Sequence, residues 1–462
     1  MSDYLAVLPG TAPEAPIAAA ASFAHQPRDF TRANALKSRF NRAIPGGAHT
    51  YAKGDDQFPE FMAPYIVRGQ GAHVWDVDGN QFVEFGAGLR SVTLGHAYAP
   101  VVRAARRQLE LGANFGRPAL LELETAEEFL ACTGAGDMVK FAKNGSDVTS
   151  AALKLARAYT GRDLVAVCQD HPFFSVDDWF MGTTPLDAGI PQAIRDLSRS
   201  FRYNDLPGLE ALLAAHPGQV AAVILEVEKD QPPAPGYLAG VQALCRREGV
   251  VLIFDEIITG FRWHRRGAQH CHGVQPDLST FGKALANGFS VAALAGRREL
   301  MELGGLDHAR QRVFLLSTTY GAETHALAAA RAVMQVYQQE PVTERLHALG
   351  ARLALGVNQA IAGHQLEPYV QLLGRPCCLT YATRDQQGQP SQALRALFLQ
   401  ETTRRGLLCP SFITNYSMTD SLIDQTVDSL HEVLAIYRLA LDNGVENYLE
   451  GRPLKVVYRK YN

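Results

Sequence analysis

Short apolar runs alternate with amphipathic stretches from about residue 134 onward, and this alternation constrains the fold more than any other feature of the chain. The apolar runs are 138–142, 164–168, 220–227 and 250–254. Stretches of helical periodicity, such as 147–158 and 237–248, separate them. Strands that are apolar along most of their length are buried on both faces, as in a parallel sheet covered by helices. The sequence therefore predicts an α/β fold with a mostly parallel sheet, in which ligands bind at the carboxyl ends of the strands.

The pattern changes after about residue 320, where two long helices are expected over 322–338 and 341–361. Short strands around 369–382 and further helices near 391–405 and 421–441 follow, so we expect a second, smaller α+β domain. Nearer the N-terminus, 72–85 reads as a β-hairpin and 98–111 as an amphipathic helix. The predicted division is a loosely ordered leader 1–28, an N-terminal segment 29–85 that joins the small lobe, a large domain 86–335 and a C-terminal small domain 336–462. The basic, aromatic tail 448–462 is expected to pack on the surface or on a partner subunit.

Composition excludes several classes of function. The formal net charge is −3, which gives no reason to expect nucleic acid or an anionic membrane as a partner. No apolar run is long enough to span a membrane. The seven cysteines form no CxxC pair, which fits reduced thiols in the cytoplasm. Cys271 lies between His270 and His272, but no second cluster follows at zinc-binding spacing, so no metal is predicted.

Two charged residues stand where an apolar segment ends. Asp255 follows the run 250–254, where a carboxylate needs a cationic partner unless it only caps a helix or forms a salt bridge. Lys283 is surrounded by small and apolar residues in 279–288. A desolvated lysine has a lowered pKa and becomes a nucleophile, although a snorkelling surface lysine is the alternative.

A third feature is the run Asn144-Gly145-Ser146, which opens a helix directly after a strand. Free backbone N–H groups at such a helix start bind phosphate, although a plain helix cap has the same appearance. Pyridoxal phosphate needs an amine for its aldehyde, a carboxylate for its ring nitrogen and a phosphate cradle. Lys283, Asp255 and this run supply one of each, so the sequence predicts pyridoxal 5′-phosphate as the cofactor.

Longer motifs resemble a known family. The run 250–267 reads VVLIFDEIITGFRWHRRG and, with Phe281-Gly282-Lys283, closely resembles class III aminotransferases. The hairpin 71–85 resembles the glutamate-1-semialdehyde 2,1-aminomutase branch of that family, as do Ile44-Pro45-Gly46-Gly47 and Leu94-Gly95-His96. The resemblance begins near residue 35 and covers nearly all of the remaining chain.

The resemblance implies a type I pyridoxal-phosphate fold and a homodimer with shared active sites. By motif, Lys283 matches the lysine that forms an imine with the cofactor, and Asp255 matches the partner of the ring nitrogen. Gly145 and Ser146 match phosphate-binding residues. Thr318 matches a threonine that reaches the phosphate of the neighbouring subunit, and Phe173 matches the aromatic residue that stacks on the ring.

The substrate-binding residues depart from the aminomutase pattern. Lys53 stands where an arginine binds the substrate carboxylate, and a lysine cannot make the bidentate contact. A Ser-Trp pair becomes Gly88-Leu89, and a Glu-Pro-Val run becomes Glu226-Val227-Glu228. We therefore expect substrate contacts at Lys53 and Glu226, and an aminotransferase that passes an amino group from a donor to a small aldehyde or keto acceptor. An intramolecular aminomutase is the alternative, because it would use the same cofactor residues. Arg90 could also bind the carboxylate, but an ordinary surface or interface arginine is the favoured interpretation, and Arg90 ranks below Lys53 as a candidate.

Two other classes of protein fit the sequence less well. A nucleotide-binding dehydrogenase would need a GxGxxG turn, and Gly86-Ala87-Gly88 lacks the third glycine at the right spacing. A catalytically silent scaffold with the same fold is opposed by the intact pair of Lys283 and Asp255.

Overall fold

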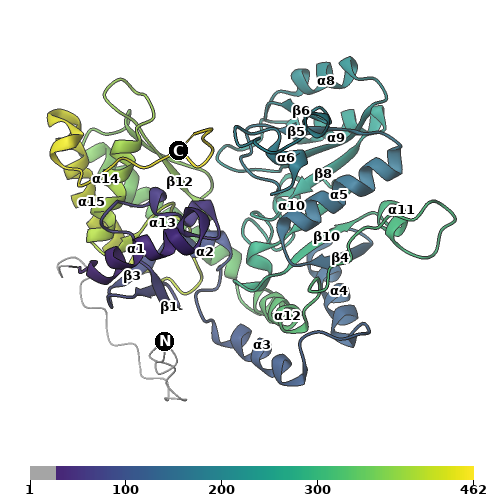
Figure 1. The fold of residues 1–462 in the computed structure, drawn as a ribbon, viewed down its shortest axis with the longest axis horizontal. Helices are drawn as coiled ribbons and strands as arrows, with labels where there is room; N and C mark the ends of the chain where they lie inside the picture. The colour runs from purple at the N-terminus through teal and green to yellow at the C-terminus, as the bar shows by residue number, and fades with distance from the viewer. Residues whose placement is uncertain (1–27, 462) are drawn as a thin grey trace.

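The computed structural model describes residues 28–461. The predicted leader 1–28 lies outside the described residues except for Arg28. Two lobes are visible in Figure 1: helices α13, α14 and α15 lie on one side with α1 (Thr31–Ala43) and β3, and a larger sheet with α5, α8 and α9 lies on the other.

The larger sheet has seven strands in the order β4-β10-β9-β8-β7-β5-β6. Their bounds are Met138–Ala142 (β4), Ala292–Gly296 (β10), Leu278–Phe281 (β9), Val251–Asp255 (β8), Val220–Glu226 (β7), Leu164–Cys168 (β5) and Ser198–Phe201 (β6). β10 is antiparallel to both neighbours, and the remaining pairs are parallel. Every residue of β5, β7 and β8 is buried, as an apolar strand covered on both faces should be. The prediction of a mostly parallel sheet in an α/β fold is confirmed.

Helices cover this sheet. α5 (Gly145–Thr160) contacts five of its strands, and α9 (Tyr237–Glu248) packs on β8 and on α8 (Leu206–Ala215). A separate layer below it in Figure 1 contains α3, α4 and α12, in which α12 contacts both α3 and α4. Their bounds are Ala99–Leu111 (α3), Leu120–Thr133 (α4) and Thr324–Gln339 (α12).

A second sheet joins distant parts of the chain. Its order is β1-β2-β3-β13, with bounds Ile66–Gln70, His73–Asp76, Gln81–Glu84 and Leu407–Leu408. β2 and β3 form the predicted hairpin, and Gly79 takes a φ of +86° in its turn. β13 pairs in parallel with β3, so residues before 85 share a sheet with residues after 400. The predicted domain boundaries themselves stay a prediction.

The C-terminal helices pack around a hydrophobic cluster distinct from the one around the large sheet. They are α13 (Val342–Gly363), α14 (Gln392–Arg404) and α15 (Asp420–Asn443), with the hairpin β11 (Val370–Leu373) and β12 (Thr380–Thr383). The tail returns to the N-terminal segment: the Lys455 N–H donates to the Asp56 carbonyl at 3.1 Å, and Arg459 pairs with the Asp56 carboxylate at 2.7 Å. The tail therefore lies on the surface of its own chain.

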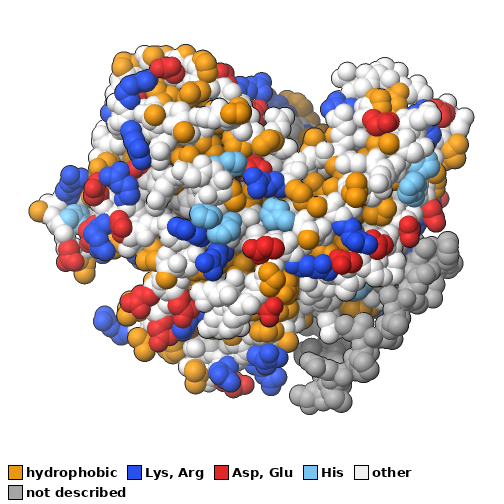
Figure 2. All heavy atoms as spheres, turned by 180° about the vertical axis from the view of Figure 1, so that it is seen from behind, with side chains coloured by type: hydrophobic (Ala, Val, Ile, Leu, Met, Phe, Trp, Pro, Cys, Tyr) orange, Lys and Arg blue, Asp and Glu red, His pale blue; other side chains and the backbone are white. Residues whose placement is uncertain are grey.

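The surface is mixed in charge. On the face in Figure 2, acidic and basic side chains are interspersed and neither sign forms a continuous field. Among the described helices, none combines the length and the apolar character needed to cross a membrane.

Candidate functional site

Three parallel strands bring polar groups to one edge of the large sheet. β7, β8 and β9 run side by side, and the register pairs Glu226 with Asp255 and Asp255 with Thr280. Lys283 follows β9 by two residues. The side chains predicted to carry the chemistry, Asp255 and Lys283, therefore belong to neighbouring strand ends, as expected for a ligand site in an α/β sheet.

Asp255 is buried, with 4% of its surface exposed. Its Oδ1 accepts hydrogen bonds from the Ile257 N–H (2.9 Å) and from Thr280 Oγ1 (3.1 Å). Burial raises the pKa of Asp255 to about 6, although the Ile257 N–H and the positive charge of Lys283 act in the opposite direction. Both hydrogen bonds from described residues end on Oδ1, so Oδ2 is available to a protonated ring nitrogen.

Lys283 is held in an unusual backbone conformation. It begins the 3-10 turn Lys283–Ala286 with a φ of +42°, which non-glycine residues rarely adopt and which is found mainly at functional sites. Burial lowers the pKa of the amine, while the carboxylates of Asp255 and Glu226 oppose this effect. A lowered pKa increases the share of neutral amine, which is the nucleophilic form.

The start of α5 lies close to both groups. A Cβ added to Gly145 would come within 2.7 Å of Ile257 Cδ1, and one added to Gly282 within 3.4 Å of Ile257 Cγ2. Ile257 thus packs between the helix start and the turn that carries Lys283. Ser146 Oγ accepts from the Val176 N–H at 3.0 Å, so the hydroxyl hydrogen is free to donate. Asn144 precedes the helix in an extended conformation, and the first N–H groups of α5 can bind a phosphate.

Two phenylalanines follow β5, and only one is available to a ligand. Phe173 is 45% exposed, whereas Phe174 is 1% exposed. The centroid of the Phe173 ring lies 5.9 Å from that of Phe180, and the two ring planes are nearly perpendicular. Stacking of Phe173 on a cofactor ring stays a prediction.

Glu226 is a buried carboxyl group with one oxygen unpartnered in the described structure, which the sequence did not indicate. It is 3% exposed, and its Oε2 has no hydrogen-bond partner among the described residues. Burial raises the pKa of Glu226 to about 7; the positive charge of Lys229 lowers it and the charge of Asp255 raises it. Its N–H donates to Nδ1 of His171, a buried histidine whose pKa burial lowers to about 3. A buried, unpartnered carboxyl group beside a lysine indicates a site that awaits a polar ligand.

Two residues predicted for the site, Lys53 and Thr318, do not contact Lys283 or Asp255 within the described part of one chain. Lys53 is exposed in the short turn Tyr51–Lys53, and Thr318 is exposed in the loop before α12. In the described part of the chain, no contact links either residue to Lys283 or Asp255. An exposed Thr318 is compatible with a role at the site of a neighbouring subunit, which stays a prediction.

Sequence reasoning missed one residue of this region. Arg262 is fully buried, and its Nη2 donates to the Arg90 carbonyl at 2.5 Å. The available signal was an arginine in an otherwise apolar stretch after Asp255. No three His, Cys, Asp or Glu side chains among residues 28–461 come together as a metal site.

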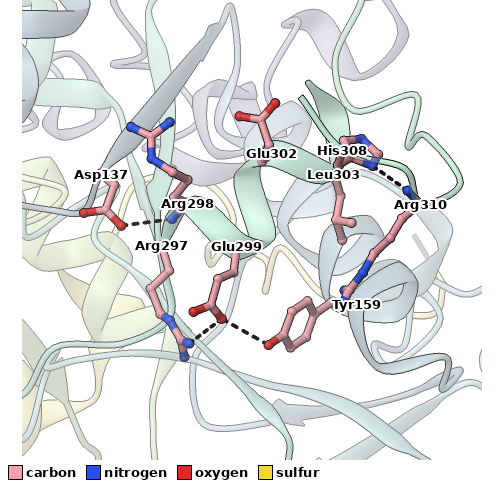
Figure 3. Close-up of a pocket in the computed structure, with 9 residues that line it drawn as sticks. All are labelled: Asp137, Tyr159, Arg297, Arg298, Glu299, Glu302, Leu303, His308 and Arg310. Carbon is pink, nitrogen blue, oxygen red and sulfur yellow. Dashed lines mark hydrogen bonds and ion pairs between the residues drawn. The ribbon is translucent and has the colours of Figure 1, made fainter. Parts of the chain in front are cut away.

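A separate pocket of about 550 Å³ is unrelated to these residues. Arg297 and Asp137 line it (Figure 3), and its Glu299 pairs with Arg297 and contacts Tyr159. Because β10 is antiparallel to β9, its last residue lies beside the first residue of β9. This pocket is therefore at the sheet edge opposite to Asp255, and the buried pair of Asp255 and Lys283 is the stronger candidate for chemistry.

Comparison with known proteins points to one family. The family model described as aminotransferase class-III matches residues 51–434. The glutamate-1-semialdehyde 2,1-aminomutase of Desulforudis audaxviator is 31% identical over 432 residues, which cover 88% of this chain and 98% of that protein. A protein of the same name from Desulfitobacterium hafniense is 34% identical over 337 residues, covering 70% and 77% of the two chains.

Solved structures share the fold. An omega-transaminase from Sphaerobacter thermophilus superposes with a TM-score of 0.79 and 26% identity, covering 87% of this chain and 97% of its own. The FumI protein of a Sphingopyxis species, solved in a form with pyridoxal phosphate, gives a TM-score of 0.81 at 25% identity, with 89% and 98% covered. A glutamate-1-semialdehyde aminomutase from Pseudomonas aeruginosa gives 0.77 at 24% identity, with 88% and 95% covered.

Proposed function

The chain belongs to the class-III aminotransferase family, and we propose from this premise that it passes an amino group from an amino donor to a small aldehyde or keto acceptor, with Lys283 and Asp255 as catalytic residues. As a member of the family it is an enzyme that depends on pyridoxal phosphate. The observation that supports the proposal is the pair of a buried carboxyl group and a lysine of lowered pKa on neighbouring strand ends. Such pairs occur where a fold tunes acid–base chemistry.

The described residues fit the cofactor. Lys283 Nζ would hold it covalently, and Asp255 Oδ2 would accept a hydrogen bond from its ring nitrogen. The start of α5, with Asn144, Gly145 and Ser146, would bind the phosphate through free backbone N–H groups and the Ser146 hydroxyl. The exposed ring of Phe173 would stack on the cofactor ring.

Bound pyridoxal phosphate supplies a ring that takes up negative charge from the substrate carbon. Lys283 then acts as the general base and acid: its neutral Nζ takes the proton from that carbon and later returns a proton to the acceptor carbon. Asp255, ionised next to a positive partner, keeps a proton on the ring nitrogen. Burial of this edge limits the access of water, which protects both proton transfers.

An aminotransferase and an intramolecular aminomutase would use the same groups. The relatives named glutamate-1-semialdehyde 2,1-aminomutase favour the second activity. The departures from the aminomutase pattern at Lys53 and at Val227-Glu228, directly after Glu226, favour the first. Formation of a keto acid from the amino donor, dependent on an added carbonyl acceptor, would support the aminotransferase. Isomerisation of a single substrate with no added acceptor would support the aminomutase.

We also propose a homodimer with shared active sites. Exposed apolar side chains gather on two segments, 109–123 and 306–320. A hydrogen bond from Asn114 Nδ2 to the Thr319 carbonyl (3.1 Å) connects the two segments. These side chains are Leu109, Leu111, Phe115, Leu120, Leu123, Leu306, Phe314 and Tyr320. Exposed apolar surface of this extent is typical of an interface, and Thr318 lies within it. All seven cysteines are free, which supports a reducing, cytoplasmic location.

The variant Lys283→Ala tests the proposed chemistry. We expect it to lower kcat by at least about 10³-fold, because both the covalent attachment and the proton transfer are lost. The matched control is Lys140→Ala, an exposed lysine of the same sheet, which should retain activity and the visible absorption of the bound cofactor. Full activity in Lys283→Ala would overturn the proposal.

A further inference from the structure

An arginine stands on a strained backbone turn beside the proposed active site. The turn α2 (Ala87–Arg90) has left-handed geometry, with φ of +45° at Ala87, +55° at Gly88, +58° at Leu89 and +70° at Arg90. A non-glycine residue in this region is strained. Three such residues within four positions persist only where contacts hold the turn, and backbone strain of this kind gathers at ligand sites.

Residues that follow Asp255 and Lys283 in the chain contact the segment that contains this turn. Arg262, which follows Asp255 in the chain, donates from Nη2 to the Arg90 carbonyl at 2.5 Å. Asn287, which follows Lys283, accepts from the Leu94 N–H at 2.8 Å and donates to the Gly95 carbonyl at 3.0 Å. The segment that carries Arg90 is therefore fastened to the two segments that carry Asp255 and Lys283.

The Arg90 side chain has no ion pair of its own in the described structure. It is partly buried, and no carboxylate of residues 28–461 lies within ion-pair distance of it. It is close enough to Glu226 and Lys283 for its charge to lower the pKa of both groups. A partly buried guanidinium without a carboxylate partner, in the electrostatic field of the catalytic amine, is suited to an anionic ligand.

We propose that Arg90 binds the carboxylate of the amino substrate, so that the enzyme acts on amino acids and not on simple amines. This inference rests on the proposed function. Arginine offers a planar pair of donors that matches both carboxylate oxygens, and α2 holds its backbone against the site. Lys53 offers a single flexible point charge on an exposed turn. Arg90 is thus a substrate-binding residue at a different position from the one that the sequence motif suggested.

Binding of an unreactive carboxylate provides a test that does not depend on turnover. Propionate and glutarate would be titrated into the holoenzyme by calorimetry. The variant Arg90→Asn removes the guanidinium, and asparagine tolerates a positive φ better than most residues, so the turn should be kept. We expect binding at least about tenfold weaker in this variant and partly restored in Arg90→Lys, since a charge without the fork keeps part of the attraction.

The matched control is Arg352→Asn, whose arginine pairs with exposed Asp424 far along the chain; its carboxylate affinity should not change. Equal affinity of Arg90→Asn and the unaltered protein for both carboxylates would overturn the inference. Melting temperature and the cofactor absorption band show that each variant is folded and loaded.

Reaction with paired donors adds a second measurement. L-Alanine would be compared with isopropylamine, which lacks only the carboxylate oxygens, by the change in the cofactor spectrum on mixing. We expect Arg90→Asn to lower the second-order rate constant for reaction with the holoenzyme by about 10²-fold for alanine and by less than threefold for isopropylamine. Equal loss for both donors would contradict the inference. If the unaltered protein reacts with neither these nor other amino donors, the proposed function fails, while the carboxylate titration still decides the role of Arg90.

Discussion

Asp255 and Glu256 are neighbours in the sequence, but their carboxyl groups have different tasks. Asp255 bonds through one oxygen and keeps the other for a ligand. Glu256 is fully enclosed: it accepts from Thr259 Oγ1 and from the N–H groups of Ala268 (2.8 Å) and Gln269 (2.7 Å). Burial raises the pKa of Glu256 to about 7 despite these bonds. Glu256 therefore fastens the loop after β8, whereas Asp255 keeps one oxygen available for the proposed chemistry.

Replacing each residue should separate these tasks. In Asp255→Asn we expect kcat to fall by about 10²–10³-fold with little change in melting temperature, because a neutral amide cannot keep the ring nitrogen protonated. In Glu256→Ala the free energy of unfolding should fall by about 3 kcal/mol, because two buried N–H groups lose their acceptor. Steady-state kinetics and denaturant unfolding of both variants provide the measurement. A large loss of stability in Asp255→Asn would contradict the assignment.

The positions of site residues are easiest to predict from the sequence where a residue directly follows a regular strand. Asp255 and Lys283 were predicted because each follows an apolar run, and the parallel sheet brings such positions together. The sequence alone favours an ordinary role for Arg90, because the contacts of its segment with Arg262 and Asn287 are tertiary. Lys53 was ranked above it on motif alignment, since its exposure cannot be read from a single sequence.

The N-terminus of α5 depends on the absence of a side chain at its first residue. A Cβ at Gly145 would meet Ile257 Cδ1 at 2.7 Å, and Ile257 follows the catalytic Asp255 by two residues. The helix can approach the strand end only because residue 145 is glycine. This close approach brings the start of α5 toward the turn of Lys283 and the end of β8, where the chemistry is proposed to occur.

The variant Gly145→Ala should therefore weaken cofactor binding. We expect the dissociation constant of pyridoxal phosphate to rise by about tenfold, because the helix start must move away from the Asp255 turn to relieve the contact. Gly116→Ala is the control, because a Cβ there meets nothing within 4 Å. Titration of the apoenzyme, followed by the cofactor absorption, measures both. Unchanged affinity in Gly145→Ala would show that the phosphate binds elsewhere.

Most regular elements were predictable because their signals are local. The helix expected over 98–111 is α3, and the strand expected over 138–142 is β4. β13 was not expected, because it has only two residues and its partner β3 lies more than 300 residues earlier in the chain. The turn α2 was likewise not expected, because Ala87, Leu89 and Arg90 carry no local preference for positive φ.

Across the whole molecule, the loop after β7 connects the catalytic sheet with the C-terminal part of the chain. Glu228 is buried and accepts from Arg375 Nε at 2.6 Å, and His272 Nε2 lies 2.7 Å from its other oxygen. Burial acts to raise the pKa of Glu228, but these hydrogen bonds outweigh it and the pKa lies below its usual value. Arg375 precedes the turn Pro376–Cys378, which packs against α13. This ion pair thus joins the end of the site strand to the second lobe.

Loss of that connection should destabilise the protein more than loss of a surface pair. In Arg375→Ala we expect the free energy of unfolding to fall by about 3 kcal/mol, because a buried carboxylate loses its main partner. In the control Arg352→Ala the exposed pair with Asp424 is lost, and the change should be below about 1 kcal/mol. Denaturant unfolding of both variants decides the comparison, and equal effects would contradict the connection.

The stability of the apoenzyme should also depend on pH through Glu226. Its pKa is about 7 in the folded chain and 4.5 in an ordinary environment, so the folded state holds the proton more tightly than the unfolded state. The stabilisation is fully present below about pH 4.5 and is lost as the pH rises through about 7. Glu226→Gln cannot ionise, so the unaltered apoenzyme should lose on the order of 2 kcal/mol relative to this variant across the interval.

Unfolding free energies of both proteins at about pH 5 and about pH 7.5 measure this difference. Glu210→Gln is the control, because Glu210 is exposed and pairs with Arg247 at the surface; its difference from the unaltered protein should not change with pH. A pH-independent difference for Glu226→Gln would show that the carboxyl group is already ionised or hydrated in the folded apoenzyme. The predicted slope would show that the folded apoenzyme favours the protonated, neutral form of Glu226, so that the burial of one carboxyl group contributes to the pH dependence of the stability of the whole molecule.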